Sequence, residues 1–194
     1  MKQIVTIDFD IIMSPSIELY NDRIGPHEKD VEATIRKFPC LNGMTANLDV
    51  YRMLTHFINK VDSKNISFIT QHREMRNFMS EFDEPIELVN IDHHHDIEYA
   101  DKDADKTDNE HDGNWVKTYF QQNKIAKYCW INNVNSTPLP VTMLEKFPHE
   151  SFYISEEILE TLNPDHLIIC LSPEWVPPTY YALFTLWREL TAKV

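Results

Sequence analysis

The stretch Ile86-Glu-Leu-Val-Asn-Ile-Asp-His-His-His-Asp96 decides how the rest of the chain is interpreted. Its first half has the length and apolar content of a buried strand. In its second half, Asp92, His94 and Asp96 occupy alternate positions, so an extended segment would point all three the same way. Two carboxylates and an imidazole at a strand end are suitable ligands for Mn²⁺, Fe²⁺ or Zn²⁺. The alternative is a polar loop whose histidines are only solvated, and the alternate spacing directly after a strand favours the metal site. A metal site is therefore predicted here.

A second acidic pair lies near the start of the chain. Residues 3–13 have the sequence Gln-Ile-Val-Thr-Ile-Asp-Phe-Asp-Ile-Ile-Met, which is typical of a central strand buried on both faces of a parallel sheet. Asp8 and Asp10 would share one face at the carboxyl end of this strand. Two buried carboxylates so close raise each other's pKa unless a cation holds them. We therefore predict that both belong to the same metal site.

Strands and helices alternate along the remainder of the chain. Strands are predicted at residues 66–70, 128–131, 152–154 and 167–171, and helices at residues 50–61 with Asn47 as cap, 115–123, 156–162 with Ser155 as cap, and from Pro177 onward. This alternation indicates a three-layer α/β fold, with a mostly parallel sheet and helices on both faces. The length of 194 residues is enough for one sizeable core and not for two, so residues 1–194 are expected to form one domain.

Two further segments carry little periodicity. Residues 14–43 are predicted to be a long loop with a short helix near residues 28–37, and residues 98–111 an acidic loop. Between them, the predicted strand at residues 66–70 leads into Gln71 and His72. Open α/β folds bind ligands at the carboxyl edge of the sheet, so His72 is a further candidate metal ligand.

Composition excludes several classes of function. The net charge of -13 argues against nucleic acid as a partner, because a polyanion needs a basic surface. No run approaches the roughly 20 apolar residues that span a bilayer, and the first residues lead directly into a strand, unlike a signal peptide. Cys40, Cys129 and Cys170 are odd in number and widely spaced, which favours a reducing compartment. We expect a cytoplasmic protein without a membrane partner.

These motifs carry a family resemblance. Asp92, His94 and Asp96 resemble the DxHxD motif of the arginase and agmatinase (ureohydrolase) family, and Thr6-Ile7-Asp8-Phe9-Asp10 resembles its S/T-x-D-x-D motif. His72 resembles the other metal-binding histidine of that family. In ordinary arginases the S/T-x-D-x-D motif follows DxHxD, whereas here it opens a much shorter chain. The chain is therefore most similar to the small peptide arginases, which convert arginine side chains of ribosomally made precursor peptides to ornithine.

The resemblance implies a binuclear site with two Mn²⁺ ions, although another divalent ion would serve. One ion would be held by Asp8, His72, Asp92 and Asp96, and the other by Asp8, Asp10, Asp92 and His94. Asp8 and Asp92 would bridge the two ions, which in such sites are roughly 3.5 to 4 Å apart. A hydroxide held between them would attack the guanidinium carbon of arginine, releasing urea and ornithine.

Two residues are assigned catalytic roles by the same resemblance. Glu174, which follows the predicted strand at residues 167–171, would accept the forked hydrogen bonds of the guanidinium group. His111 would carry a proton to the leaving amine. His93 and His95 would point away from the ions in an extended segment and support the ligands instead. The substrate would be an arginine-containing peptide or a small guanidine, and the sequence does not determine the oligomeric state.

Other classes of function stay open. Asp8 and Asp10 with Asp92-His93-His94 resemble the DHH phosphoesterases, which hold Mn²⁺ around a phosphoester. Those proteins carry a second domain with a glycine-rich segment, whereas this chain has 3 Gly. A single-zinc deacetylase of arginase-like fold would not need Asp8, Asp10 and Asp96 together. A non-catalytic metal-binding interaction module would hold one ion or none, and its function would not depend on Glu174.

Overall fold

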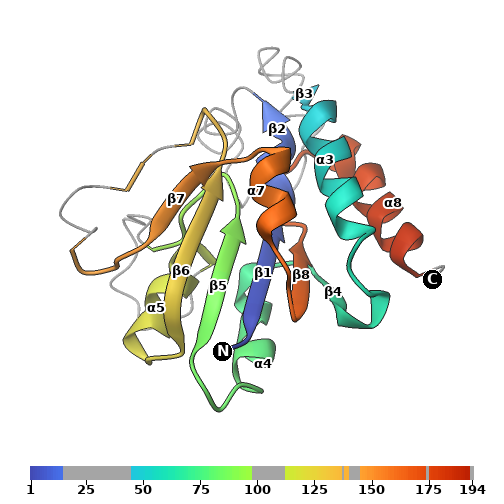
Figure 1. The fold of residues 1–194 in the computed structure, drawn as a ribbon. Helices are drawn as coiled ribbons and strands as arrows, with labels where there is room; N and C mark the ends of the chain where they lie inside the picture. Colours follow the sequence, from blue (N-terminus) through green and yellow to red (C-terminus); the bar gives the residue numbers. More distant parts are fainter. Residues whose placement is uncertain (15–44, 98–111, 137, 140–144, 174, 193–194) are drawn as a thin grey trace.

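The computed structural model describes residues 1–14, 45–97, 112–136, 138–139, 145–173 and 175–192, which form an α/β fold. At its centre lies a six-stranded sheet with strand order β4-β8-β1-β5-β6-β7 (Figure 1). Its strands are β1 (Gln3–Asp8), β4 (Ile66–Ile69), β5 (Ile86–Ile91), β6 (Ile125–Asn132), β7 (Glu150–Tyr153) and β8 (His166–Cys170). Every neighbouring pair in this sheet is parallel, which confirms the predicted sheet type.

Helices cover both faces of the sheet, as the three-layer prediction requires. One face carries α3 (Leu48–Ile58), α7 (Glu156–Thr161) and α8 (Tyr181–Thr191), and the other carries α4 (Met75–Met79) and α5 (Trp115–Gln121) (Figure 1). Short 3-10 helices are η1 (Phe9–Ile12), η3 (Ser63–Asn65), η4 (His72–Glu74), η5 (Asp112–Asn114) and η6 (Pro178–Tyr180). A small antiparallel pair joins β2 (Met13–Ser14) to β3 (Thr45–Ala46). No helix in the described part of the chain has the length and apolar content needed to cross a membrane.

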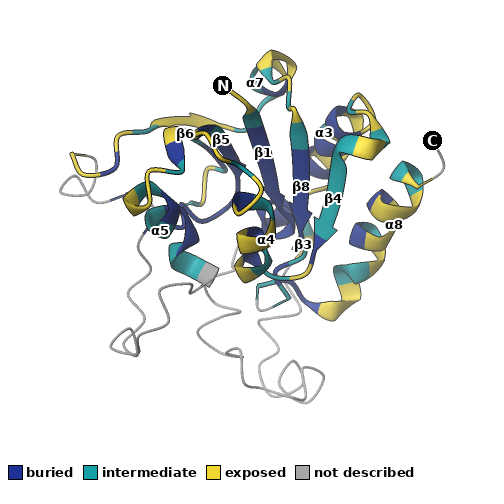
Figure 2. Ribbon diagram, turned by 90° about the horizontal axis from the view of Figure 1, so that it is seen from below, coloured by how far each residue is buried: buried dark blue, intermediate teal, exposed yellow. Residues whose placement is uncertain are grey.

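The core is divided by the sheet into two clusters. In β1, Val5 and Ile7 pack into the cluster beneath α3 and α8, whereas Ile4 packs into the cluster beneath α4 and α5. Alternate side chains of a strand point to opposite faces, so a central strand covered on both faces must be apolar at most positions. Figure 2 shows this pattern: β1 and β8 are largely buried, while the outer faces of the helices are exposed.

Parallel pairing brings several strand ends to one edge. β1 lies between β5 and β8, with Ile7 in register with Ile91 and Asp8 in register with Cys170. The residues that follow these strands therefore meet at the carboxyl edge, where open α/β sheets bind their ligands.

The first strand is shorter than predicted. β1 ends at Asp8, and the chain continues as η1 instead of remaining extended to residue 13. The carboxylate of Asp8 accepts a hydrogen bond from the backbone N–H of Asp10 at 3.4 Å, which caps the 3-10 helix. The apolar residues of η1 are buried, as they would be in a strand, so their pattern did not distinguish the two conformations.

Both predicted helix caps are confirmed. Asn47 Oδ1 accepts hydrogen bonds from the backbone N–H groups of Asp49 and Val50, at 3.1 and 3.2 Å, at the start of α3. Ser155 Oγ accepts one from Ile158 N at 3.3 Å at the start of α7. β6 and β7 begin a few residues before the predicted positions. The predicted helix near residues 28–37 and the acidic loop at residues 98–111 lie outside the described residues.

Candidate metal centre

The predicted metal ligands lie together at the carboxyl edge of the sheet. They are Asp8, Asp10, His72, Asp92, His94 and Asp96, and each is at most 5% exposed. Asp8 ends β1 and Asp10 lies in η1, while the turn after β5 supplies the two remaining carboxylates and one imidazole. His72 opens η4 after β4, at the far side of β8 from β1.

The residues after β5 converge through a turn, not through the extended segment that the sequence predicted. β5 ends at Ile91. The backbone N–H of His94 donates to Asp92 Oδ1 at 2.8 Å, so the aspartate folds the chain back on itself. Asp96 then adopts φ 50°, in the left-handed region. The alternately spaced residues do lie close together, but the prediction that they share one face of an extended segment is wrong.

Asp10 and His94 meet although they follow different strands. Asp10 Oδ2 lies 2.9 Å from His94 Nδ1. Asp10 Oδ1 accepts a hydrogen bond from the backbone N–H of His93 at 3.3 Å. The turn after β1 and the turn after β5 are thereby held against each other.

His72 lies between two carboxylates. Its Nε2 is 3.6 Å from Asp8 Oδ2, and its Nδ1 is 3.3 Å from Asp96 Oδ2. The backbone at this corner is fixed by Glu74, whose Oε1 accepts hydrogen bonds from the N–H groups of Thr70 and Gln71, both at 2.9 Å. The imidazole is therefore held with each ring nitrogen directed toward an acidic partner.

A network behind the carboxylates was not found from the sequence. Thr6 Oγ1 donates to Asn90 Oδ1 at 2.5 Å, and Asn90 Nδ2 donates to Asp92 Oδ2 at 3.0 Å. Trp115 Nε1 donates to Asp96 Oδ2 at 2.6 Å. The available signal was the presence of Thr6 and Asn90 among the apolar residues of the two strands, because a buried polar side chain needs a partner.

Burial and mutual repulsion act on these carboxylates together. Burial, followed by the charges of Asp96, Asp10 and Asp8, raises the pKa of Asp92 well above its ordinary value. The pKa of Asp8 is also raised well above its ordinary value, chiefly by burial and then by Asp10. Burial raises the pKa of Asp96 against partial opposition from His72 and His94.

Asp10 is the exception. Burial acts to raise its pKa, but the charge and hydrogen bonding of His94 and the charge of His93 outweigh that effect, and the pKa is lowered. One carboxylate of the cluster is thus stabilised in its charged form by a histidine. Burial destabilises the charged form of the other three carboxylates, and no positive side chain that the structure describes offsets this fully. A bound cation would stabilise their charged form.

The donor atoms suit a divalent metal ion. Three sets of donors each lie within 4.8 Å of one another: Asp8, His72 and Cys170; Asp10, Asp92 and His94; and His72, Asp92 and Asp96. Asp92 is common to two of these sets, as a bridging carboxylate would be. His72 Nε2 is buried and has no hydrogen-bond partner among the described residues. Carboxylate oxygens and imidazole nitrogens are ligands of Mn²⁺, Fe²⁺ and Zn²⁺, so the residues fit such an ion.

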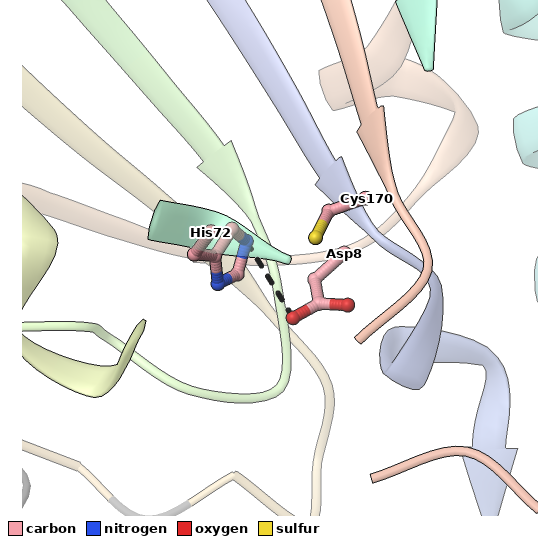
Figure 3. A group of neighbouring side chains, drawn as sticks. All are labelled: Asp8, His72 and Cys170. Carbon is pink, nitrogen blue, oxygen red and sulfur yellow. Dashed lines mark ion pairs between the residues drawn. The ribbon is translucent and has the colours of Figure 1, made fainter. Parts of the chain in front are cut away.

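One of these donors, Cys170, was not predicted. It is the last residue of β8 and is buried beside Asp8 and His72 (Figure 3). Ser172 Oγ donates to Asp8 Oδ2 at 2.7 Å and lies 3.3 Å from Cys170 Sγ. Burial and then the charge of Asp8 raise the pKa of the Cys170 thiol well above 9.0. At the end of an apolar strand a cysteine is easily mistaken for a packing residue.

The two other histidines of the turn, His93 and His95, are buried and contact residues outside the set of predicted ligands. His93 Nδ1 lies 3.2 Å from Asn133 Nδ2. His95 Nδ1 accepts a hydrogen bond from the backbone of Ile97 at 3.2 Å, and its ring packs edge-to-face on Trp130. Burial, followed by the charges of His94 and His149, lowers the pKa of His95 to about 4.

The two residues that the resemblance makes catalytic, Glu174 and His111, lie outside the described residues. The neighbour of Glu174, Trp175, is described, and its ring lies against His94 with centroids 4.3 Å apart. Comparison of the chain with protein-family models, with curated proteins and with solved structures finds no match.

Proposed function

We propose that this protein is a metal-dependent hydrolase with a binuclear site, which cleaves the guanidinium group of arginine, within a peptide, to ornithine and urea. The observation that carries the proposal is the set of four buried aspartates and two buried histidines at one sheet edge, with Asp92 common to two sets of donors. The guanidine substrate comes from the resemblance of the two motifs to those of ureohydrolases.

In this proposal the protein residues divide into two groups around Asp92. Asp8 and His72 would hold one ion with it, and Asp10 and His94 would hold the other; Asp96 lies beside His72 in the first group. Two bound divalent ions supply a nucleophile at neutral pH by lowering the pKa of a water molecule. Thr6 and Asn90 orient Asp92 through the hydrogen bonds at 2.5 and 3.0 Å described above.

The reaction is a hydrolysis that consumes one water. The water oxygen bonds to the guanidinium carbon, and the bond from that carbon to the side-chain nitrogen breaks, which yields urea and the amine of ornithine. One proton must reach the departing nitrogen, and His111 is the residue to which the resemblance gives this step. Glu174 would fix the planar cation through forked hydrogen bonds.

A cationic substrate also agrees with the charge and the aromatic residue at the site. The chain has a net charge of -13, which attracts a positively charged peptide over distance. Trp175 lies beside His94, and an indole ring is a favourable partner for a guanidinium ion.

The test combines metal counting with product detection. The purified chain is analysed for bound metal, loaded with Mn²⁺, and incubated with an arginine-containing peptide. Mass spectrometry then looks for the loss of the mass of cyanamide, the net change from arginine to ornithine. We expect two ions per chain and this mass loss, both abolished in Asp92→Asn. Asp83→Asn, at an exposed bend before β5, removes the same charge and should leave both unchanged.

Two negative outcomes would have different consequences for the proposal. Two ions without turnover of the peptide, free arginine or agmatine would overturn the guanidine substrate and direct the search to phosphoesters. Absence of bound metal under all conditions would overturn the hydrolase proposal as a whole.

A further inference from the structure

Three adjacent strands bring a thiol to the metal donors. Asp8 ends β1 and Cys170 ends β8, and the two residues are partners in the register of these strands. Cys170 is also in register with Ile69, the last residue of β4, beyond which η4 begins at His72. Figure 3 shows the carboxylate, the imidazole and the sulfur converging at the ends of the strands.

The geometry of this trio fits a single ion. The donor atoms of Asp8, His72 and Cys170 lie within 4.8 Å of one another, and all three residues are buried. His72 Nε2 is 3.6 Å from Asp8 Oδ2. Two ligands on one tetrahedral ion, each about 2.1 Å from it, are about 3.4 Å apart. Nε2 is also buried and has no hydrogen-bond partner in the described part of the chain, so its lone pair is available to bind an ion.

His72 cannot serve both of its possible sets at once. A neutral imidazole has an available lone pair on only one ring nitrogen, and the other nitrogen carries a proton. If Nε2 binds the ion, the proton is on Nδ1, which lies 3.3 Å from Asp96 Oδ2. Trp115 Nε1 donates to that same oxygen at 2.6 Å and holds it in place. Metal-bound histidines commonly direct their second nitrogen to a carboxylate in this way.

We infer that Cys170 Sγ, Asp8 and His72 Nε2 hold one of the two ions, and that Asp96 positions His72 instead of binding the metal. This inference rests on the proposed metal site. It identifies which metal ion the position beside Cys170 binds. Thiolate ligands favour Zn²⁺ and other thiophilic ions, whereas Mn²⁺ favours oxygen ligands. The Cys170 position is therefore selective for Zn²⁺, while Asp10, Asp92 and His94 form a set of ordinary oxygen and nitrogen donors.

Co²⁺ is the probe for the test, because a thiolate bound to it gives a near-ultraviolet charge-transfer band in addition to the visible d–d bands. The protein is titrated anaerobically with Co²⁺, alongside Cys170→Ser, Cys170→Ala, Cys129→Ser and Cys40→Ser. We expect the charge-transfer band in the wild type and in the Cys129 and Cys40 variants, and its loss in both Cys170 variants. The preference for Zn²⁺ over Mn²⁺ should fall at least 10-fold in Cys170→Ser.

A second measurement needs no variant and so does not depend on the folding of one. X-ray absorption of the Zn²⁺-loaded wild type should detect a sulfur ligand about 2.3 Å from zinc. Visible d–d bands without a charge-transfer band, or a band that survives in Cys170→Ser, would overturn the inference and leave the proposed hydrolase standing. Absence of any cobalt binding would overturn both.

Discussion

Oδ2 of Asp10 lies 2.9 Å from Nδ1 of His94, and the two residues come from turns that follow different strands. Two ligands at right angles on one ion, each about 2.1 Å away, are about 3 Å apart. An ion pair between a carboxylate and a protonated imidazole has the same separation. The two explanations differ in what happens when the charge of Asp10 is removed.

Asp10→Asn distinguishes these explanations. If Asp10 is a ligand, the bound metal should fall from two ions per chain to one, because an amide oxygen is a much weaker ligand than a carboxylate. Elemental analysis after dialysis against a metal buffer measures this. Asp49→Asn, at an exposed position of α3, is the matched control and should keep both ions. An unchanged metal content in Asp10→Asn would leave the pair as an ion pair only.

The link from Thr6 through Asn90 to Asp92 gives a second prediction. Asn90→Leu removes the donor to Asp92 Oδ2 while keeping the side-chain volume, and we expect metal affinity to weaken about 10- to 100-fold. Competition with a chelator measures the affinity. Asn132→Leu is the control, because this buried asparagine ends neighbouring β6 and donates instead to Ser151 Oγ. Equal losses in both variants would argue against a specific role for Asn90.

Much of the fold was predictable because it depends on local pattern. The strand before Asp92, the strand at residues 66–70 and the caps at Asn47 and Ser155 each follow from residue types within a few positions. β1 was predicted too long because buried apolar residues continue beyond Asp8 into η1. Burial alone does not distinguish a strand from a short 3-10 helix, and the cap that ends the strand is a single side-chain contact.

The candidate site was predictable where its residues are close in sequence, or where one lies just after a predicted strand, as His72 does. The motif around His94 and the pair Asp8 and Asp10 were found from spacing, although the backbone at both places turns instead of running straight. Cys170 was missed because its position beside Asp8 depends on the register of β8 with β1, a long-range pairing that the local sequence does not encode. The orientation of Asp96 by Trp115 is long-range in the same sense.

The stability of the fold should depend on a cluster separate from the metal centre. Trp187 is fully buried, stacks on Tyr51 at 4.9 Å, meets Phe9 edge-on and donates from Nε1 to Thr55 Oγ1 at 2.7 Å. Trp187→Ala should lower the free energy of unfolding by about 3 to 5 kcal/mol, measured by chemical denaturation. Leu186→Ala, at a neighbouring exposed position, should change it by no more than about 0.5 kcal/mol. Similar losses in the two variants would contradict this assignment of the core.

The raised carboxylate pKa values predict how the metal-free protein responds to pH. A carboxyl whose pKa is higher in the folded than in the unfolded state binds more protons when folded, so its contribution to stability declines as pH rises between the two values. For Asp92 this decline begins near its ordinary value of 3.8 and continues upward to the raised value. Asp8 and Asp96 act in the same direction, and Asp10, with a lowered pKa, acts in the opposite one.

Thermal unfolding in the presence of a chelator tests the sign. Because the pKa of His95 is about 4 in the folded protein, His95 increases the stability as pH rises toward 6.5. This contribution is present in both the wild type and Asp92→Asn. The difference between these two proteins therefore isolates the carboxylate, and the stability of Asp92→Asn relative to the wild type should increase with pH. Metal ions replace protons on the ligands, so stabilisation of the wild type by Mn²⁺ should also grow with pH. A relative stability that falls with pH, or a metal effect independent of pH, would show that burial and the neighbouring carboxylates do not raise the pKa of Asp92.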